Sequence, residues 1–506
     1  MLARINSFGL SGIEGFPVSV EIDIGNGLPG IEIVGLPDTA TKESKERVRS
    51  ALKNSGFRLS PKRVTVNLAP ADMKKEGSAF DLPIALGMLC ATEQLSSVGL
   101  GDAIFVGELS LGGELGKVNG ILPILLAAKE AGYRRAVIPA GNAEEASFVS
   151  GIDTYAFPDL RSVTAYLAGG NALPLEVRDP QAAAADAHGE DLKYVKGQYA
   201  ARRAMEIAAA GGHNILMIGP PGGGKTMLAK CLPSILPDMS AEEMLETTKI
   251  HSVAGMLEGG IVCRRPFRSP HHTASRIALT GGGASARPGE MSLAHNGVLF
   301  LDELPEYPRA TLEILRQPVE DGRITVSRAA RSVDYPARFM LVASMNPCPC
   351  GNYGNPAAEC TCTPSQISRY MARISGPLLD RIDIHIEVGG VTYDELSSSE
   401  DAEDSATVKA RVNEARKVQL ARFAGSGIYC NAQMSGADVR KYCAIDAESE
   451  KLLRSAFAKL GLSARAYTRI LKVARTIADL DGSERVMKKH IAEAVQYRSL
   501  DRSRRI

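Results

Sequence analysis

Eight consecutive residues have the types and spacing needed to hold a nucleoside triphosphate. An apolar run at 215–218 precedes them and helix-forming residues follow, the strand, loop and helix order that this glycine-rich motif requires. Glycines let backbone N–H groups turn toward phosphate, a lysine reaches the outer phosphates and a threonine holds Mg²⁺. We therefore predict binding and hydrolysis of ATP with Mg²⁺, the alternative being a glycine-rich turn matched by chance. The residues of the motif are Gly219, Pro220, Pro221, Gly222, Gly223, Gly224, Lys225 and Thr226.

Two adjacent carboxylates follow a second apolar run, downstream of the glycine motif. Residues 297–301 lead directly into Asp302 and Glu303. Such a run is typical of a buried parallel strand, and α/β proteins place their chemistry at the carboxyl ends of these strands. Because the chain also contains the glycine loop, we predict that Asp302 binds Mg²⁺ through water and that Glu303 polarises the attacking water. The alternative is a core strand that ends in two solvated acids.

A third apolar run, 339–345, ends at Asn346. A side-chain amide at this place is suited to orient the same attacking water, so we predict a catalytic role for Asn346. The arrangement matches the sensor-1 strand of AAA+ ATPases.

Arg381 lies in a segment, 376–383, that resembles the one presenting an arginine finger to a neighbouring subunit's nucleotide in AAA+ proteins. A guanidinium there supplies fixed positive charge where the γ-phosphate oxygens gain negative charge, an effect worth about a thousandfold or more in rate. The alternative is that Arg381 only pairs with Asp380 or Asp383.

Arg465 stands at the start of a helix expected to run through Asp479. We assign it the catalytic role of the sensor-2 arginine of AAA+ proteins. Arg469, one turn further along the same helix face, is the competing choice.

Three arginines mark a predicted hairpin between 320 and 335, inserted before the third apolar run. They are Arg323, Arg328 and Arg331. Basic loops at such a place, together with the arginine-rich stretch 264–273, can line the pore of a ring and follow a DNA phosphate backbone. The alternative is a charged hairpin that forms a solvated edge.

Four of the nine cysteines form the pattern C-x-C-x₉-C-x-C, and they are Cys348, Cys350, Cys360 and Cys362. Four thiolates closed by a short loop suit a tetrahedral structural zinc, although C-x-C is less usual than C-x₂-C. Reduced loop thiols are the alternative. A disulfide framework is not expected in a cytosolic chain.

These residues must be positioned by several domains, since 506 residues with 44% hydrophobic content suffice for two to four cores. We predict an α/β chain with a domain at 1–170, a linker at 171–192, an ATPase core at 193–395 and a helical lid at 396–506. Alternation and β-branching predict N-terminal strands at 18–24, 31–34 and 64–68 and a helix at 42–55. Three-to-four spacing of apolar residues predicts lid helices at 407–423, 448–460, 464–480 and 487–498.

The charge and hydropathy of the chain restrict where the protein can be located and what it can bind. The net charge is +1, so any nucleic-acid surface must come from local clustering. No stretch reaches the ~18 apolar residues of a spanning helix, and the start of the chain does not resemble a signal peptide. We expect a cytoplasmic protein with no membrane partner.

The N-terminal third resembles the proteolytic domain of Lon proteases, an α+β fold like domain 2 of ribosomal protein S5. The resemblance rests on residues 74–79, 107–113 and 125–128. In that family a lysine activates a serine nucleophile. Ser78 matches the serine, but Leu122 occupies the lysine position and cannot take a proton. A scaffold without peptidase chemistry is therefore favoured, and a lysine recruited from elsewhere would be required for a protease.

Taken together, the Lon-like domain, the AAA+ core with its insertions, the run 346–351 and the Arg465 helix resemble the magnesium-chelatase-like ATPases of the YifB/ComM group. The resemblance covers almost the whole chain. It implies a bacterial cytoplasmic ATPase that forms hexameric rings and, in its ComM members, a DNA helicase that drives branch migration when incoming DNA is integrated by recombination in natural transformation.

Three functions remain open at this point. The first is a ring-forming motor that moves single-stranded or branched DNA. The second is a chelatase-like ATPase that remodels a protein partner without DNA. The third is an ATP-linked protease, which is disfavoured because Leu122 occupies the position of the catalytic lysine.

Overall fold

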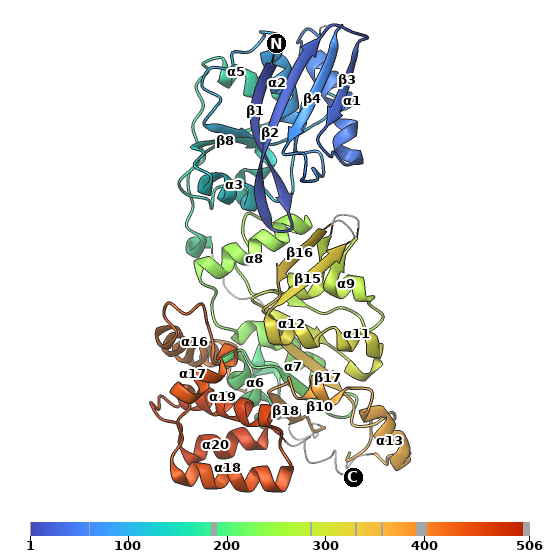
Figure 1. Ribbon diagram of the computed structural model, residues 1–506. Helices are drawn as coiled ribbons and strands as arrows, with labels where there is room; N and C mark the ends of the chain where they lie inside the picture. The colour runs from blue at the N-terminus through green and yellow to red at the C-terminus, as the bar shows by residue number, and fades with distance from the viewer. Residues whose placement is uncertain are drawn as a thin grey trace.

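The computed structural model describes residues 2–59, 61–183, 190–283, 286–328, 331–355, 358–390 and 402–498. The chain is mixed α/β and elongated, with the N-terminal region at one end, a parallel-sheet core in the middle and a helical segment at the other end (Figure 1). The predicted boundary at 395/396 and part of the predicted linker, 184–189, lie outside the described residues. None of the described helices combines the length and apolar character needed to cross a bilayer.

The N-terminal region is built on two sheets. In the first, of order β1-β2-β4-β3, β2 pairs antiparallel with β1 and β4, and β3 runs parallel to β4. The second, β5-β8-β9, is parallel. Alternate residues of β4 are buried because one face of its sheet packs on the core. The elements are β1 (Leu2–Ser11), β2 (Glu14–Gly25), β3 (Gly30–Val34), α1 (Thr39–Asn54), β4 (Arg63–Ala69), α2 (Asp81–Ala91), β5 (Ala103–Phe105), β6 (Glu108–Leu109), β7 (Leu115–Gly116), α3 (Ile121–Glu130), β8 (Arg135–Pro139), α4 (Ala143–Ala146), β9 (Asp153–Phe157) and α5 (Leu160–Leu167).

The core is a five-stranded parallel sheet of order β11-β14-β17-β10-β18. Every residue of β10, β14 and β17 is buried, as expected for strands covered on both faces. The elements up to β14 are α6 (Tyr199–Gly211), β10 (Ile215–Ile218), α7 (Lys225–Ile235), α8 (Ala241–Ala254), β11 (Phe267–Arg268), α9 (Arg276–Thr280), β12 (Gly281–Gly282), β13 (Arg287–Pro288), α10 (Glu290–Leu293) and β14 (Val298–Leu301). Those that follow are α11 (Arg309–Glu313), α12 (Arg316–Asp321), β15 (Arg323–Arg328), β16 (Arg331–Pro336), β17 (Met340–Met345), α13 (Pro364–Met371), α14 (Gly376–Leu379) and β18 (Ile384–Glu387).

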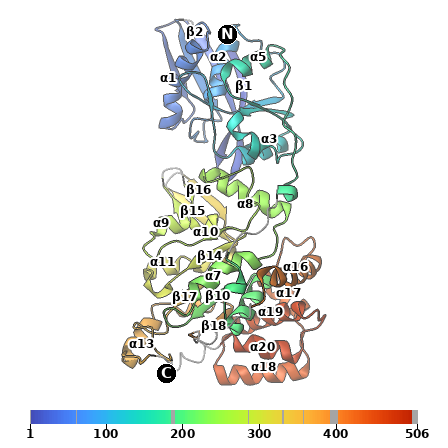
Figure 2. The same ribbon diagram turned by 180° about the vertical axis from the view of Figure 1, so that it is seen from behind.

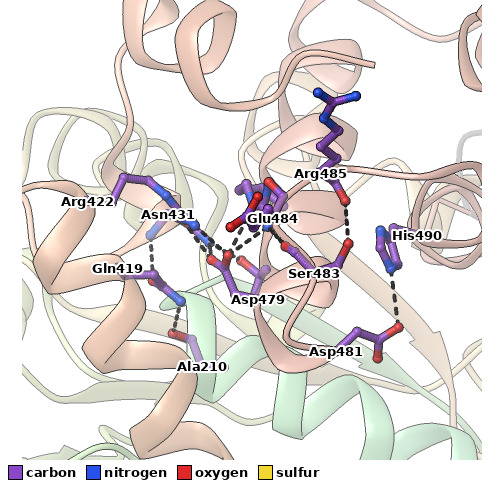
Figure 3. Close-up of polar contacts among 12 residues, drawn as sticks. Ala210, Gln419, Arg422, Asn431, Asp479, Asp481, Ser483, Glu484, Arg485 and His490 are labelled. Atoms are coloured by element: carbon purple, nitrogen blue, oxygen red, sulfur yellow. Dashed lines mark hydrogen bonds and ion pairs between the residues drawn. The ribbon is translucent and has the colours of Figure 1, made fainter. Parts of the chain in front are cut away.

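The C-terminal segment is helical and docks on the core through buried polar contacts as well as apolar ones. Figure 3 shows Arg422 and Asn431 turned toward Asp479, and each donates to its carboxylate at 2.8 Å. Gln419 extends the network by donating to the carbonyl of Ala210 on α6 at 3.1 Å. The contacts of Asp479 hold the parts of the segment together, and the Gln419 contact joins the segment to α6 of the core. The helices are α16 (Ser405–Arg422), α17 (Gly436–Tyr442), α18 (Ala447–Leu460), α19 (Ala464–Leu480) and α20 (Lys488–Gln496).

The N-terminal region contacts the core through α8 and the β15–β16 hairpin, and both views place the end of the β1–β2 hairpin beside them (Figures 1 and 2). Ser252 of α8 accepts a hydrogen bond from the Gly120 N–H at 2.9 Å. The turn residue Gly12 has no room for a side chain, because a Cβ there would lie 2.2 Å from Cγ1 of Val333 on β16. The N-terminal region therefore packs on two elements of the core, α8 and the β15–β16 hairpin.

Candidate functional site

The glycine loop connects the carboxyl end of β10 to the start of α7. Gly222 and Gly224 adopt left-handed backbone angles, with φ of 76° and 84°, which residues with a side chain rarely adopt. A Cβ on Gly219 would lie 2.1 Å from the carbonyl oxygen of Val388. Conformation and space thus both require glycine, and α7 directs its positive amino end toward the loop.

Lys225 is buried and its ammonium lies inside the loop. Its Nζ donates to the carbonyl oxygens of Gly219 at 2.7 Å and Pro220 at 2.9 Å and to Oδ1 of Asn346 at 3.1 Å. Burial lowers the pKa of Lys225, and the charges of Asp302 and Glu303 oppose this shift. The ammonium is therefore placed to donate charge-assisted hydrogen bonds to phosphates bound in the loop.

Asp302 and Thr226 face each other across the loop. Thr226 Oγ1 donates to Oδ2 of Asp302 at 2.8 Å, and the Ser344 hydroxyl donates to the other carboxylate oxygen. The hydroxyl and carboxylate are oxygen ligands of the kind that Mg²⁺ prefers, so the predicted pair is brought together in a fitting geometry. Ser344, the second-last residue of β17, was not predicted to join the site. Its position near the carboxyl end of a predicted strand was the feature of the sequence that could have indicated it.

Glu303 follows Asp302 in a left-handed conformation, with φ of 52°, and its side chain is exposed. Its carboxylate Oε2 lies 3.6 Å from Nδ1 of His272. The His272 ring packs on that of His271 with centroids 4.0 Å apart. The sequence predicted the acid but not the imidazole. Residues soon after β11 lie at the same sheet edge as Asp302 because β11 runs parallel to β14, a pairing that the sequence does not show.

The sheet order explains why Asn346 joins the site. β17 lies between β10 and β14, so the residue after β17 falls between the glycine loop and the two acids. The structure thus gathers the predicted nucleotide-site residues Lys225, Thr226, Asp302 and Asn346 at one edge of the sheet, with Glu303 beside them.

Arg381 and Arg465 lie at the opposite, amino edge of the sheet. Both line a cavity of about 720 Å³ whose wall includes Asn214, Gly297 and Asp383, which directly precede β10, β14 and β18. The strands between the two edges have four to six residues, which at about 3.3 Å per residue separates the edges by roughly 13–20 Å. Arg381 and Arg465 are therefore brought together with each other and kept apart from Lys225 of the same chain.

The arginines of this cavity differ in their partners. Arg381 is buried, pairs with Glu320 and donates to the carbonyl of Pro377 at 2.9 Å. Of its predicted alternative partners, Asp383 pairs instead with Arg469.

Arg469 pairs with buried Asp383, while Arg465 is exposed and makes no ion pair with any residue that the structure describes. Burial alone would raise the pKa of Asp383, but Arg469 and His213 hold it below its usual range. Asp383 thus holds Arg469 in place, whereas Arg465 keeps its guanidinium available in the cavity.

The predicted hairpin is present as β15 and β16, in the register Arg323 with Pro336 and Arg328 with Arg331. The tip residues 329–330 and the side chains of Arg328 and Arg331 lie outside the described parts of the chain. Arg323 is at the other end of the hairpin, in a cavity of about 520 Å³ that Arg381 also lines. The sequence analysis grouped the three arginines together, but Arg323 lies at one end of the hairpin and Arg328 and Arg331 at the other.

The four cysteines converge after β17. The Sγ atoms of Cys348 and Cys350 are 3.4 Å apart, those of Cys348 and Cys360 are 3.7 Å apart, and all four sulfurs lie within 4.8 Å of one another. Four sulfurs at about 2.3 Å from one tetrahedral ion lie about 3.8 Å from each other, so the arrangement fits a metal ion. Backbone N–H groups of Asn352 and Thr361 lower the pKa of the Cys350 thiol, whereas burial and the neighbouring sulfurs raise the pKa of Cys360 and Cys362, so the support for a metal ion is the distances between the sulfurs.

Ser78 has no lysine partner among the described residues. Its hydroxyl donates to Glu108, while Lys75, the nearest buried lysine in sequence, donates from Nζ to the carbonyls of Pro70 and Met73. Leu122 is buried, and its N–H donates to Glu145 at 2.9 Å. The serine–lysine pair of a Lon-type protease is thus not formed within the described structure.

Comparison with known proteins gives three family matches. Residues 191–396 match "Magnesium chelatase, subunit ChlI", residues 20–142 match "Subunit ChlI of Mg-chelatase", and residues 402–498 match "Magnesium chelatase, subunit ChlI C-terminal".

Full-length relatives are also found. The chain is 46% identical over 506 residues to the competence protein ComM of Haemophilus influenzae, covering 99% of this chain and 98% of that protein. It is 46% identical over 504 residues to the uncharacterized protein YifB of Escherichia coli, with the same coverage. The magnesium-chelatase 38 kDa subunit of Cereibacter sphaeroides is 27% identical over 174 residues, which cover 30% of this chain and 51% of that subunit.

Proposed function

The chain belongs to the YifB/ComM family of magnesium-chelatase-like AAA+ proteins, and we propose that it is a ring-forming motor that uses ATP hydrolysis to drive branch migration of DNA. The observation that carries the proposal is the separation of the two halves of the catalytic set. Lys225, Asp302 and Glu303 lie at the carboxyl edge of the sheet, and Arg381 and Arg465 lie in the cavity at its amino edge.

A split site of this kind favours a head-to-tail ring. If the amino edge of one subunit faces the glycine loop of the next, Arg381 and Arg465 approach the neighbour's γ-phosphate rather than their own. Such heterologous contacts close into a ring when the rotation between subunits allows it. We propose a hexamer, the ring size that the family resemblance implies.

Within each site the residues have separate tasks. Lys225 would bind the outer phosphates, and Thr226 and Asp302 would hold Mg²⁺, which neutralises charge that develops on the phosphates. Glu303 would orient the attacking water and take its proton, assisted by Asn346. Arg381 of the adjacent subunit would stabilise charge on the γ-phosphate oxygens, an effect worth roughly 10³–10⁵ in rate.

DNA is the proposed substrate for two reasons. The name of the Haemophilus relative, a competence protein, agrees with the role that the ComM resemblance implies. The hairpin also carries Arg328 and Arg331 as an opposed pair on its last ladder position, next to its tip. Cations at the end of a protruding hairpin can follow a phosphate backbone without reading sequence. A cytoplasmic location, which the resemblance also implies, is part of the proposal.

The test is ATP turnover and strand exchange on defined DNA. We expect single-stranded and branched DNA to stimulate the ATPase, and a mobile four-way junction to be resolved with ATP but not with a non-hydrolysable analogue. The Glu303→Gln variant should bind the junction and fail to move it. A protein that binds no DNA at low salt, and whose ATPase ignores every DNA structure, would contradict the proposal.

One observation favours a second candidate, a chelatase-like ATPase that remodels a protein partner without DNA. The N-terminal region packs on the hairpin at Val333, so part of this insertion already serves a protein contact. Stimulation of the ATPase by a protein partner but by no form of DNA would select this candidate.

A further inference from the structure

The four-cysteine loop lies directly against the nucleotide loop. Gly351, within the cysteine loop, has φ of +84°, and a Cβ there would lie 2.5 Å from Cδ and 2.7 Å from Cγ of Pro221. Pro221 is the third residue of the glycine motif. The two loops therefore touch with no space between them at this point.

A second connection runs through the backbone. Asn346, whose Oδ1 accepts a hydrogen bond from Lys225 at 3.1 Å, is separated from Cys348 by a single residue. Cys348 is fully buried, and its Sγ accepts a hydrogen bond from the N–H of Tyr353 at 3.3 Å. Any group that holds the Cys348 sulfur thus holds the residue that orients the Lys225 ammonium.

The same cluster also joins two elements of the core. Cys348 follows the end of β17, and Cys362 directly precedes Thr363, the N-cap of α13. An ion bound by all four sulfurs closes the segment between these elements. Metal binding by such a loop contributes its free energy to ordering the loop, because the unfolded chain does not hold the four sulfurs together.

From these contacts we infer that the four cysteines form a zinc site that is energetically coupled to nucleotide binding: zinc holds the loop that positions Pro221 and Asn346, and nucleotide in turn tightens the hold on zinc. Coupling of this kind is reciprocal, so each ligand changes the affinity of the other by the same factor. The inference rests on the proposed ATPase site, but the metal itself can be measured without any nucleotide.

Two glycines of the loop allow a matched test. Gly351 and Gly354 both adopt left-handed angles, with φ of 84° and 77°, but a Cβ on Gly354 would meet nothing within 4 Å. Gly351→Ala and Gly354→Ala therefore impose similar backbone strain, and only the first disturbs Pro221. We expect both variants to retain about one zinc per chain by elemental analysis. The dissociation constant for Mg²⁺-ATPγS should rise about tenfold in Gly351→Ala and less than about threefold in Gly354→Ala. Equal affinities would overturn the coupling.

A reciprocal measurement uses the wild type. Zinc transfer to a chromogenic chelator should be several times slower when Mg²⁺-ATPγS is bound, and Lys225→Ala should abolish this protection. An unchanged transfer rate in the wild type would overturn the coupling, and freshly purified protein without zinc would overturn the metal site.

Removal of a ligand completes the test. Cys360→Ser should lose the metal and bind nucleotide about tenfold or more weakly, while Cys263→Ser, outside the cluster, should change neither property. Metal-free Cys360→Ser with wild-type nucleotide affinity would overturn the coupling alone. A wild type that holds zinc but binds no nucleotide would overturn the proposed ATPase together with the coupling.

Discussion

The two edges of the core sheet carry opposite sets of polar groups. At the carboxyl edge, short contacts already connect the groups to one another, with Lys225 held by Asn346 and Asp302 held by Thr226. At the amino edge, the cavity holds an excess of guanidinium groups, of which Arg465 has no ion pair among the described residues. Contacts within the chain hold the groups of the first edge, whereas at the second edge Arg381 and Arg469 are paired and Arg465 stays exposed. In the proposed ring, one chain would supply the phosphate and Mg²⁺ ligands of its own site and the arginines of its neighbour's site.

The largest effects should come from the carboxyl edge. Lys225→Ala removes the ammonium that would bind the phosphates, so ATP affinity should be lost. Glu303→Gln should bind ATP as the wild type does but hydrolyse it roughly 10²–10⁴ times more slowly, because the carboxylate acts on water. Calorimetry and single-turnover hydrolysis measure the two properties, with Lys230→Ala on the exposed face of the same helix as control. Equal loss of binding in both variants would refute the division of tasks.

Arg381→Ala tests whether the amino edge acts on a neighbouring subunit. Alone it should lower hydrolysis by about 10³-fold or more. Mixed with Lys225→Ala subunits it should regain activity, because about a quarter of the head-to-tail interfaces then combine an intact loop with an intact arginine. Steady-state ATPase across mixing ratios gives the answer, after ring formation has been confirmed by light scattering and subunit exchange by co-purification of differently tagged variants. No recovery at any ratio would assign Arg381 to its own chain or to the ion pair with Glu320.

Arg469 and Arg465 should separate stability from catalysis within the amino edge. Arg469→Ala leaves the buried Asp383 carboxylate without its guanidinium, which should lower the free energy of unfolding by about 3–5 kcal/mol. Arg465→Ala should leave unfolding unchanged and lower the ATPase rate. Urea denaturation and ATPase assays of the two variants distinguish these outcomes.

The loss in Arg469→Ala should depend on pH. In the wild type the pKa of Asp383 is lowered, so its stabilising contribution is present at neutral pH and is lost only as the pH falls below the normal carboxyl range. Without Arg469, burial favours the protonated acid, so acidification to about pH 4 should relieve the penalty. The difference in unfolding free energy between the two proteins should therefore be smaller at pH 4 than at pH 7. A difference that grows on acidification would contradict this account of Asp383.

The smallest effect concerns the tip end of the β15–β16 hairpin, opposite the end that carries Arg323. Arg328→Ala with Arg331→Ala should reduce the slope of log binding constant against log salt by roughly one per lost phosphate contact and leave DNA-independent ATPase unchanged. Arg323→Ala, at the other end of the hairpin, is the matched comparison. A reduced slope in Arg323→Ala as large as that for each tip arginine would show that DNA follows the whole hairpin.

Some features of the chain follow from the sequence alone because they depend on neighbouring residues. The run 215–218, the glycines after it and Lys225 occur within a dozen positions, and their spacing dictates strand, loop and helix. The helix predicted at 464–480 is observed with the same bounds, and the one predicted at 448–460 begins one residue earlier. Three-to-four apolar spacing is read directly from the chain, so these elements required no tertiary information.

Only the tertiary structure decided which distant residues meet. His272 faces Glu303 and Ser344 binds Asp302 because β11, β14 and β17 lie side by side in a parallel sheet, an order that no local pattern encodes. Arg465 lies at the amino edge because Arg469, on the same helix, pairs with Asp383, the residue that precedes β18. Gly351 meets Pro221 of the nucleotide loop because β17, which leads into the cysteine loop, lies beside β10. Spacing along the chain determines local conformation, but packing between elements sets the distances across the fold, and these distances decide which groups share a site.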